Sequence, residues 1–170
     1  MPIHTLIAKR KERKIHGGVI MQPLLTSGLL LALCGMAAAQ TVPAGWNVIK
    51  EGKGACQAAI PPDWAPGSGP GTAHAKDMME GMLVVTSDVD RLQPMPEFLQ
   101  QSLVDQMIEN TDKRVFYSEK ANASSQNRLY HATVPGKGGK GRCHATVTFQ
   151  PSKVKDEIAK QIALSIGPVK

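Results

Sequence analysis

Aromatic residues are scarce in this chain, at 4% of its 170 residues. Proteins that bind single-stranded nucleic acid stack bases on aromatic rings that interleave with Lys and Arg. Here the few aromatic residues fall at apparent core positions instead. The charge points the same way, because +4 of the formal +6 lies in the first 39 residues and the remainder is nearly balanced. These features argue against a nucleic-acid partner.

The chain also lacks an apolar run long enough to cross a bilayer as a helix, which takes about 20 residues. Its longest run, Leu24 to Ala39, is broken by Thr26, Ser27 and two glycines. A basic cluster from Lys9 to Lys14 precedes this run, and the run ends with A-A-A directly before Gln40. This order is typical of an export signal. We therefore predict a signal peptide over residues 1–39 and a single exported domain over 40–170, periplasmic or extracellular, without stable membrane insertion after cleavage.

Two questions concern the predicted signal peptide, which we also call the leader. Translation starts at Met1 or at Met21, and the sequence does not decide between them. Cys34, in L-A-L-C-G, resembles a lipoprotein acylation site, but Leu33 stands where such sites have a small residue. We expect Cys34 to leave with the signal peptide.

Cysteine is rare as well, with three in the whole chain. Without the leader, Cys56 and Cys143 remain. An even number of cysteines in an oxidising compartment favours a bridge over free thiols. We predict a Cys56–Cys143 disulfide, the alternative being two buried free thiols.

Sequence signatures of enzymes are largely missing. No serine lies in a G-x-S-x-G elbow. Gly136 to Gly141, G-K-G-G-K-G, satisfies G-x-G-x-x-G, but a dinucleotide fingerprint is followed by a helix, and here a strand is predicted to follow. We interpret it as a hairpin tip in which Gly138 and Gly139 supply positive φ; contact of its Lys137, Lys140 and Arg142 with an anionic partner is the alternative. We predict no catalytic, cofactor-binding or metal-binding residues.

Hydrophobic periodicity predicts an α+β domain. Two helices are expected, over Glu97–Asn110 and from Ser152, as N-cap, to Ile166. Ala65 to Gly71 is expected to be a flexible loop, and Met82 to Ser87 a strand buried on both faces. The other predicted strands are Trp46–Lys50, Ala55–Ile60, Val115–Glu119, Arg128–Val134 and Arg142–Phe149.

The tetrapeptide H-A-T-V occurs twice, beginning at His131 and at His144, in the two arms of the predicted hairpin. Neighbouring strand residues point to opposite faces, so Cys143 is predicted to face the core and His144 to face out, which rules out a nucleophile–base pair between them. His131 and His144 are predicted to share the outer face, opposite or diagonal to each other, as solvated side chains. As half of a zinc or copper site, they are the alternative route to a small metal-dependent or hydrolytic enzyme.

Three features carry a resemblance to a known family: Ile60-Pro61 followed by Trp64, the terminal helix with its I-x-x-x-I-A-x-S-I pattern, and the order of predicted elements over residues 46–167. In these the chain resembles the PsbP-like extracytoplasmic domains, including small exported bacterial proteins of unknown function. The resemblance implies an α/β/α sandwich, a central antiparallel sheet with two main helices packed on it. It carries no shared catalytic residue.

We therefore expect a non-enzymatic exported binding or accessory module whose partner is a protein, an envelope component or a small ligand. A stabilising accessory of a membrane complex is one form of this expectation. Asn122-Ala123-Ser124 is a glycosylation sequon, relevant in a host that glycosylates exported proteins. The sequence does not indicate the oligomeric state.

Overall fold

The computed structural model describes residues 42–87, 93–120 and 125–170, all within one compact unit. These residues form mainly antiparallel sheets and two α-helices, which confirms the α+β class. The elements in chain order are β1 (Asn47–Lys50), β2 (Cys56–Ile60), β3 (Ala65–Pro66), β4 (Thr72–His74), β5 (Gly81–Ser87), α1 (Glu97–Leu103), β6 (Val104–Asn110), β7 (Val115–Glu119), β8 (Arg128–Pro135), η1 (Lys137–Gly139), β9 (Arg142–Phe149), α2 (Asp156–Leu164) and β10 (Gly167–Pro168).

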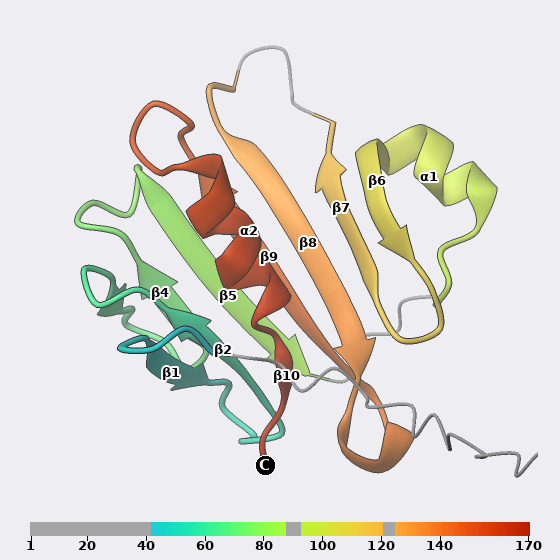
Figure 1. The fold of residues 1–170 in the computed structure, drawn as a ribbon, viewed down its shortest axis with the longest axis horizontal. Helices are drawn as coiled ribbons and strands as arrows, with labels where there is room; N and C mark the ends of the chain where they lie inside the picture. The colour runs from blue at the N-terminus through green and yellow to red at the C-terminus, as the bar shows by residue number, and fades with distance from the viewer. Residues whose placement is uncertain (1–41, 88–92, 121–124) are drawn as a thin grey trace, which may run out of the picture. The chain divides into compact units, whose positions relative to one another are not determined.

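The strands form two sheets. Seven of them make the large sheet, in the order β3-β4-β5-β9-β8-β7-β6, and the others make a small sheet in the order β1-β2-β10. Every pair in both sheets is antiparallel. Figure 1 shows α2 lying across β5, β9 and β8, with β1 and β2 beside it and α1 next to β6.

The main core lies on the face of the large sheet that carries Phe116, Tyr130 and Val147, which we call the first face. Apolar side chains of β5, β8 and β9 there pack against Ala159 and Ile162 of α2 and against the small sheet. Alternation along each strand brings these apolar residues to one side. Helix α2 is therefore held on the sheet by buried apolar contact.

The opposite face carries Tyr117 and His131, and we call it the second face. A smaller core lies at its β6–β7 end, where Met95, Val104, Val115 and Tyr117 are buried, with Leu99 of α1 packed against them. The two helices thus pack against opposite faces of the large sheet. No residue of α1 itself is buried, so α1 covers less of the sheet than α2 does.

The helix predicted over Glu97–Asn110 is wrong in its second half. Helix α1 ends at Leu103, and residues 104–110 form β6, the edge strand paired with β7. Val104 and Met107 both pack in the smaller core although they are three residues apart, which a regular strand does not allow. Register shifts at Val104/Gln106 and Met107/Glu109 change the phase of β6, since a bulge inserts one extra residue. Because the bulges allow residues three positions apart to face the same core, the apolar residues of β6 have the spacing that is typical of a helix.

Three other predictions need correction. Residues 65–71 are not wholly irregular, because β3 begins at Ala65 and pairs with β4. Strand β5 is not buried on both faces, since Met82 is 38% exposed. Helix α2 begins at Asp156 after Lys155, without a side-chain cap, so Ser152 is not its N-cap; it ends at Leu164, and Ile166 lies beyond it.

The glycine-rich segment is a hairpin tip, as predicted. It joins β8 to β9, and Gly138 and Gly139 have φ values of 64° and 75°. Gly136 is required for a different reason, because a Cβ atom there would lie 2.2 Å from the Lys140 carbonyl oxygen. The segment therefore closes a turn and precedes a strand, which is not the context of a nucleotide-binding loop.

The predicted disulfide is present. It joins Cys56 of β2 to Cys143 of β9, with a Cα–Cα distance of 5.4 Å. Both residues are buried in the main core. The bridge links the small sheet to the large one. Within the described ranges, neither helix has the length and apolar character needed to cross a bilayer.

The turn after β1 is organised by the buried side chain of Glu51, which is 8% exposed. Its carboxylate accepts hydrogen bonds from the backbone N–H groups of Lys53 and Ala55, each at 2.7 Å. Burial by itself raises the pKa of Glu51, but hydrogen bonds outweigh it and hold the pKa below its ordinary value. The donors are the backbone N–H groups of Lys53, Ala55 and Cys56 and the hydroxyl of Ser87.

We expect Glu51→Gln to lower the free energy of unfolding at pH 7 by about 1 to 3 kcal/mol, since hydrogen bonds to a charged acceptor are lost. A pKa that folding lowers contributes stability above the unfolded value of about 4.3, and this contribution disappears as the pH falls through the folded value. The variant should lack that acid-side loss. Urea unfolding from pH 3 to 7 measures both effects. Glu157→Gln, at an exposed position, is the control, and equal curves for both variants would contradict the prediction.

Candidate functional site

The second face carries a polar cluster formed by Glu119, His131, Thr133, His144 and Thr146, in which the two histidines and Thr133 are buried and the other two are half-buried. These residues come from β7, β8 and β9, which lie side by side in the sheet. His131 and His144 are 5% and 4% exposed, so the prediction that they are solvated is wrong. Alternation correctly placed them on the face away from Cys143, but both rings are buried on that face.

The two histidines are diagonal neighbours, which is one of the two arrangements predicted. His131 is paired in register with Thr146, and His144 with Thr133. Their rings are stacked with centroids 5.5 Å apart, and Tyr117 stacks on His131 at 5.0 Å. The His131 ring therefore stacks with both Tyr117 and His144, and its nitrogens make their polar contacts at the edge of the ring.

All four ring nitrogens lie within hydrogen-bond distance of a side chain. His131 Nε2 is 2.6 Å from Glu119 Oε2, and His131 Nδ1 is 3.3 Å from Thr146 Oγ1. His144 Nε2 is 3.0 Å from Thr146 Oγ1, and His144 Nδ1 is 2.8 Å from Thr133 Oγ1. The Nδ1 of His131 and the Nε2 of His144 are 3.4 Å apart.

With both imidazoles neutral, one assignment of protons satisfies these contacts. The Thr133 hydroxyl donates to His144 Nδ1, and His144 Nε2–H donates to Thr146 Oγ1. The Thr146 hydroxyl then donates to His131 Nδ1, and His131 Nε2–H donates to the Glu119 carboxylate. Each group acts as donor and acceptor within its chemical capacity. The cluster is thus a directional chain of hydrogen bonds that ends on a carboxylate.

This geometry does not form a metal site. Glu119 and His144 contact opposite nitrogens of His131, so the three side chains do not point at a common position. A bound zinc ion needs three or four ligands that converge on it. In the described parts of the chain, no group of three or more His, Cys, Asp or Glu side chains has that arrangement.

We expect His144→Ala to lower the free energy of unfolding by about 1 to 3 kcal/mol, because it removes a hydrogen-bond partner of Thr133, which is 2% exposed. Thr148→Ala, on the same face of β9 and half-buried, is the matched control, with an expected change below about 0.5 kcal/mol. Urea unfolding of both variants provides the test. A loss for His144→Ala no larger than that of the control would show that the cluster does not stabilise the fold.

Glu119 also lines a pocket of about 300 Å³, near the end of β8 at which Arg128 lies. Next to this pocket, the Tyr130 hydroxyl donates to Asp156 Oδ1 at 2.8 Å, and Lys160 Nζ lies 2.7 Å from Asp156 Oδ2. Burial and the Asp156 carboxylate raise the pKa of Tyr130. Burial alone would raise the pKa of Asp156, but Lys160 and Tyr130 hold it below its ordinary value. The lining residues are Asp105, Gln106, Ser118, Glu119, Arg128 and Tyr130.

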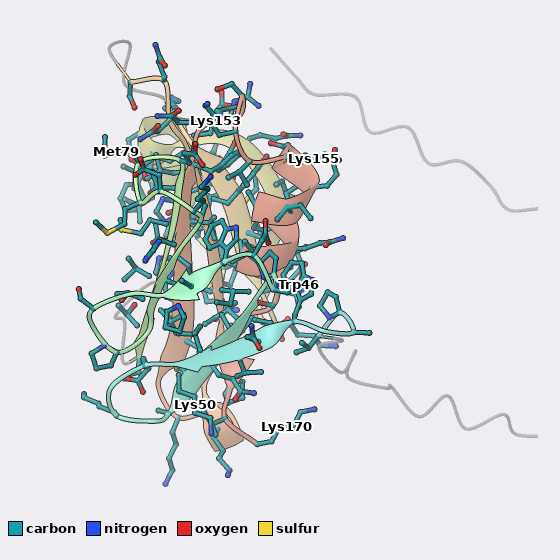
Figure 2. The ribbon with its side chains drawn as sticks, turned by 90° about the vertical axis from the view of Figure 1, so that its left-hand side faces the viewer. Trp46, Lys50, Met79, Lys153, Lys155 and Lys170 are labelled. Atoms are coloured by element: carbon teal, nitrogen blue, oxygen red, sulfur yellow. A yellow bond between two sulfur atoms is a disulfide. The ribbon has the colours of Figure 1, made fainter. Side chains whose placement is uncertain are left out.

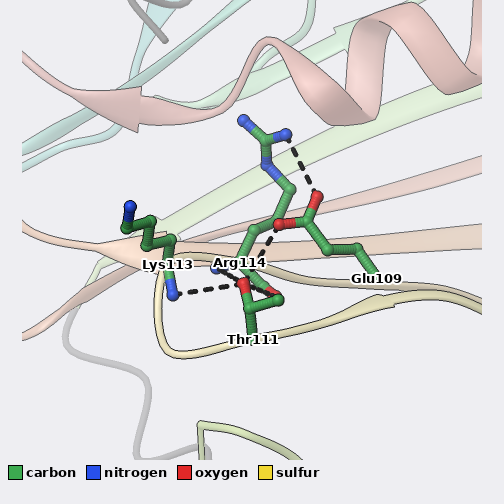
Figure 3. Close-up of polar contacts among 4 residues, drawn as sticks. All are labelled: Glu109, Thr111, Lys113 and Arg114. Carbon is green, nitrogen blue, oxygen red and sulfur yellow. Dashed lines mark hydrogen bonds and ion pairs between the residues drawn. The ribbon is translucent and has the colours of Figure 1, made fainter. Parts of the chain in front are cut away.

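Another polar group lies at the turn between β6 and β7 (Figure 3). Thr111 Oγ1 donates to Glu109 Oε1 and accepts from the backbone N–H groups of Lys113 and Arg114. Arg114 Nη1 lies 3.4 Å from Glu109 Oε2. These contacts are local and close the turn, so we assign this group a structural role.

Sequence reasoning identified the two histidines but missed Glu119, Thr133 and Thr146. A usable signal existed, since Glu119 lies in a predicted strand and alternation puts it on the face of Tyr117. What the sequence lacked was the pairing of β7 with β8 that brings Glu119 beside His131. The predicted signal peptide, Cys34 and the Asn122 sequon lie outside the described residues. No family model, curated protein or solved structure matches the chain.

Proposed function

We propose that this protein is a non-enzymatic exported module, periplasmic or extracellular, that binds a protein, an envelope component or a small ligand, and that its domain is PsbP-like. The observation that supports it best is the engagement of all four ring nitrogens of His131 and His144 with neighbouring side chains. The two imidazoles, which are the side chains on this face best suited to acid–base chemistry, thus make contacts that link β7, β8 and β9.

The pocket beside Tyr130 is the place where we expect the ligand or partner to make contact. It combines acidic, basic, amide and hydroxyl side chains from three adjacent strands. The Arg128 side chain is 63% exposed, and its Nη1 lies 3.8 Å from Asp156 Oδ1, so its guanidinium group is accessible to a partner. A polar concave site of this kind suits a partner that presents hydrogen-bonding or charged groups.

Affinity capture from the native envelope, with chemical cross-linking, tests this proposal. Immobilised residues 40–170 should retain a specific partner, and Arg128→Ala should retain it less well. Lys113→Ala, exposed at the β6–β7 turn, is the control. A partner kept equally by all three proteins would remove the pocket from the proposal, while no specific partner and no bound small molecule would remove the binding function.

One observation supports a second candidate, a small hydrolytic enzyme that uses His131 and His144. Thr146, His131 and Glu119 lie in a row with distances of 3.3 and 2.6 Å, the order of a hydroxyl nucleophile, its base and an orienting acid. Assays with ester, amide and phosphoester substrates decide this. Turnover that is lost in Thr146→Val and in His131→Gln would establish the enzyme, and turnover that these variants leave unchanged would reject it.

A further inference from the structure

The loop between β4 and β5 and the start of β5 carry three methionines that have no part in the functions proposed above. Met78, Met79 and Met82 fall within five positions, and the first of them is four residues after His74. The first two are 64% and 69% exposed, and Met82 is 38% exposed. Figure 2 labels Met79 on this loop, at the outer surface of the molecule. Thioethers are soft ligands that select Cu(I) among the common metal ions, and imidazole also suits copper.

The strand register places His74 against Met82. These residues are Cα partners in the antiparallel pair of β4 and β5. Side chains directly opposite each other share one face of the sheet, with Cβ atoms about 4.5 to 5.5 Å apart. The imidazole and one thioether therefore extend from neighbouring points on the second face.

The loop brings a second thioether to the same histidine. A pocket of about 490 Å³ is lined by His74, Lys76, Asp77, Met78 and Glu80. The loop is tied down at its base, where the Ala75 N–H donates to the Gly81 carbonyl at 2.9 Å. Asp77 Oδ1 accepts from the Met79 N–H at 2.9 Å and fixes the turn. Met78 and His74 therefore border the same space, on a loop that these two bonds order.

The His74 ring is oriented as a metal ligand needs to be. Its Nδ1 lies 2.6 Å from the carbonyl oxygen of Ala75, a contact in which the ring nitrogen donates its proton. Metal-binding histidines commonly donate one N–H to a backbone carbonyl, which fixes the tautomer and leaves the other nitrogen for the metal. Among the described residues, His74 Nε2 has no hydrogen-bond partner, so its lone pair is available.

Charge does not oppose a monovalent cation here. Lys76 is offset by Asp77 and Glu80, and Lys153 Nζ lies 3.9 Å from Glu80 Oε1. A methionine side chain has three rotatable bonds and a polarisable sulfur, so two of them can close on one ion. Thioethers also form no disulfides, which keeps this ligand set intact in the oxidising compartment that we expect for the protein.

We propose that His74 Nε2 and the sulfur atoms of Met78 and Met82 form a binding site for Cu(I). The site is independent of the pocket beside Tyr130 and of any protein partner, so its failure would not affect the binding function. Met79 is outside the ligand set. It therefore provides a matched control from the same loop, with the same side chain and similar exposure.

The test is a titration of purified residues 40–170 with Cu(I), under argon with ascorbate and in competition with bicinchoninate. We expect one ion per chain and a loss of affinity of at least about tenfold in Met78→Leu, Met82→Leu and His74→Ala. Met79→Leu should change affinity less than threefold. Leucine conserves the volume and apolar character of methionine, so the fold should persist, and thermal unfolding of each variant checks it.

A second readout uses Ag(I) as a redox-inert substitute. In a spectrum of methyl-labelled methionines, Ag(I) should shift the methyl signals of Met78 and Met82 and leave those of Met79 and Met107 unchanged. Zn²⁺ should shift neither, since thioethers are poor ligands for it. Absence of one-to-one Cu(I) binding, or an equal loss of affinity in Met79→Leu and Met82→Leu, would overturn the proposal.

Discussion

Replacing both bridging cysteines by alanine should lower the free energy of unfolding by about 3 to 5 kcal/mol, the largest effect that we expect from any change in this protein. The bridge spans a sequence separation of 87 residues, and cross-linking a loop of that length restricts the unfolded chain strongly. Alanine is chosen because Cys56 and Cys143 are 2% and 0% exposed, and a buried serine hydroxyl would add a cost of its own. Thermal unfolding should show a fall in Tm of about 10 to 20 °C.

The reductant response provides the control for this prediction. Excess reductant should lower the Tm of the wild-type protein towards that of the Cys56→Ala/Cys143→Ala variant and leave the variant unchanged. A thiol assay on the denatured, unreduced protein should find neither cysteine reactive. A wild-type Tm that does not respond although reduction is complete would show that the bridge adds little to stability.

Truncation of Ile162 should produce the second largest loss, about 2 to 5 kcal/mol for Ile162→Ala. This residue is 0% exposed and belongs to the main core, where α2 meets the first face of the sheet. The cost combines lost burial with the cavity that remains when neighbours do not fully relax. Urea unfolding should show a lower midpoint with an unchanged slope, since the surface exposed on unfolding is nearly the same.

Ile108→Ala is the matched control, because it deletes the same atoms from the edge strand β6, where Ile108 is 42% exposed. We expect it to change the free energy of unfolding by less than about 0.5 kcal/mol. If both variants lost a similar amount of unfolding free energy, Ile162 would contribute no more than an exposed edge residue. That result would contradict the packing of α2 against the main core.

Residues 97–110 show where local pattern fails as a guide. Leu99, Leu103 and Met107 recur at a helical interval, yet only the first half of the segment is a helix. The second half forms a strand because β7 offers its backbone a partner, and the bulges allow Val104 and Met107 to reach the same small core. Neither the partner nor the bulges are visible in the segment itself.

The histidines show the same limit at the candidate site. Alternation correctly assigned His131 and His144 to the face opposite Cys143, whereas only the register of β8 with β9 showed that they are diagonal and not directly opposite. Their burial was not predictable from the hairpin, because it depends on what covers the second face and on the pairing that brings Glu119 to His131. Polar residues at alternate positions look solvated until the other side of the sheet is known.

Features that depend on neighbours along the chain could be predicted from the sequence: the class of the fold, the glycine hairpin and the faces on which the residues of β8 and β9 lie. The bridge could also be predicted, because Cys56 and Cys143 are the two cysteines outside the predicted signal peptide. The tertiary structure alone decided where helix gives way to strand, which polar side chains are buried, and that His74 lies opposite Met82. The physical reason is that burial and cross-strand contact are set by segments distant in sequence, and no local pattern records them.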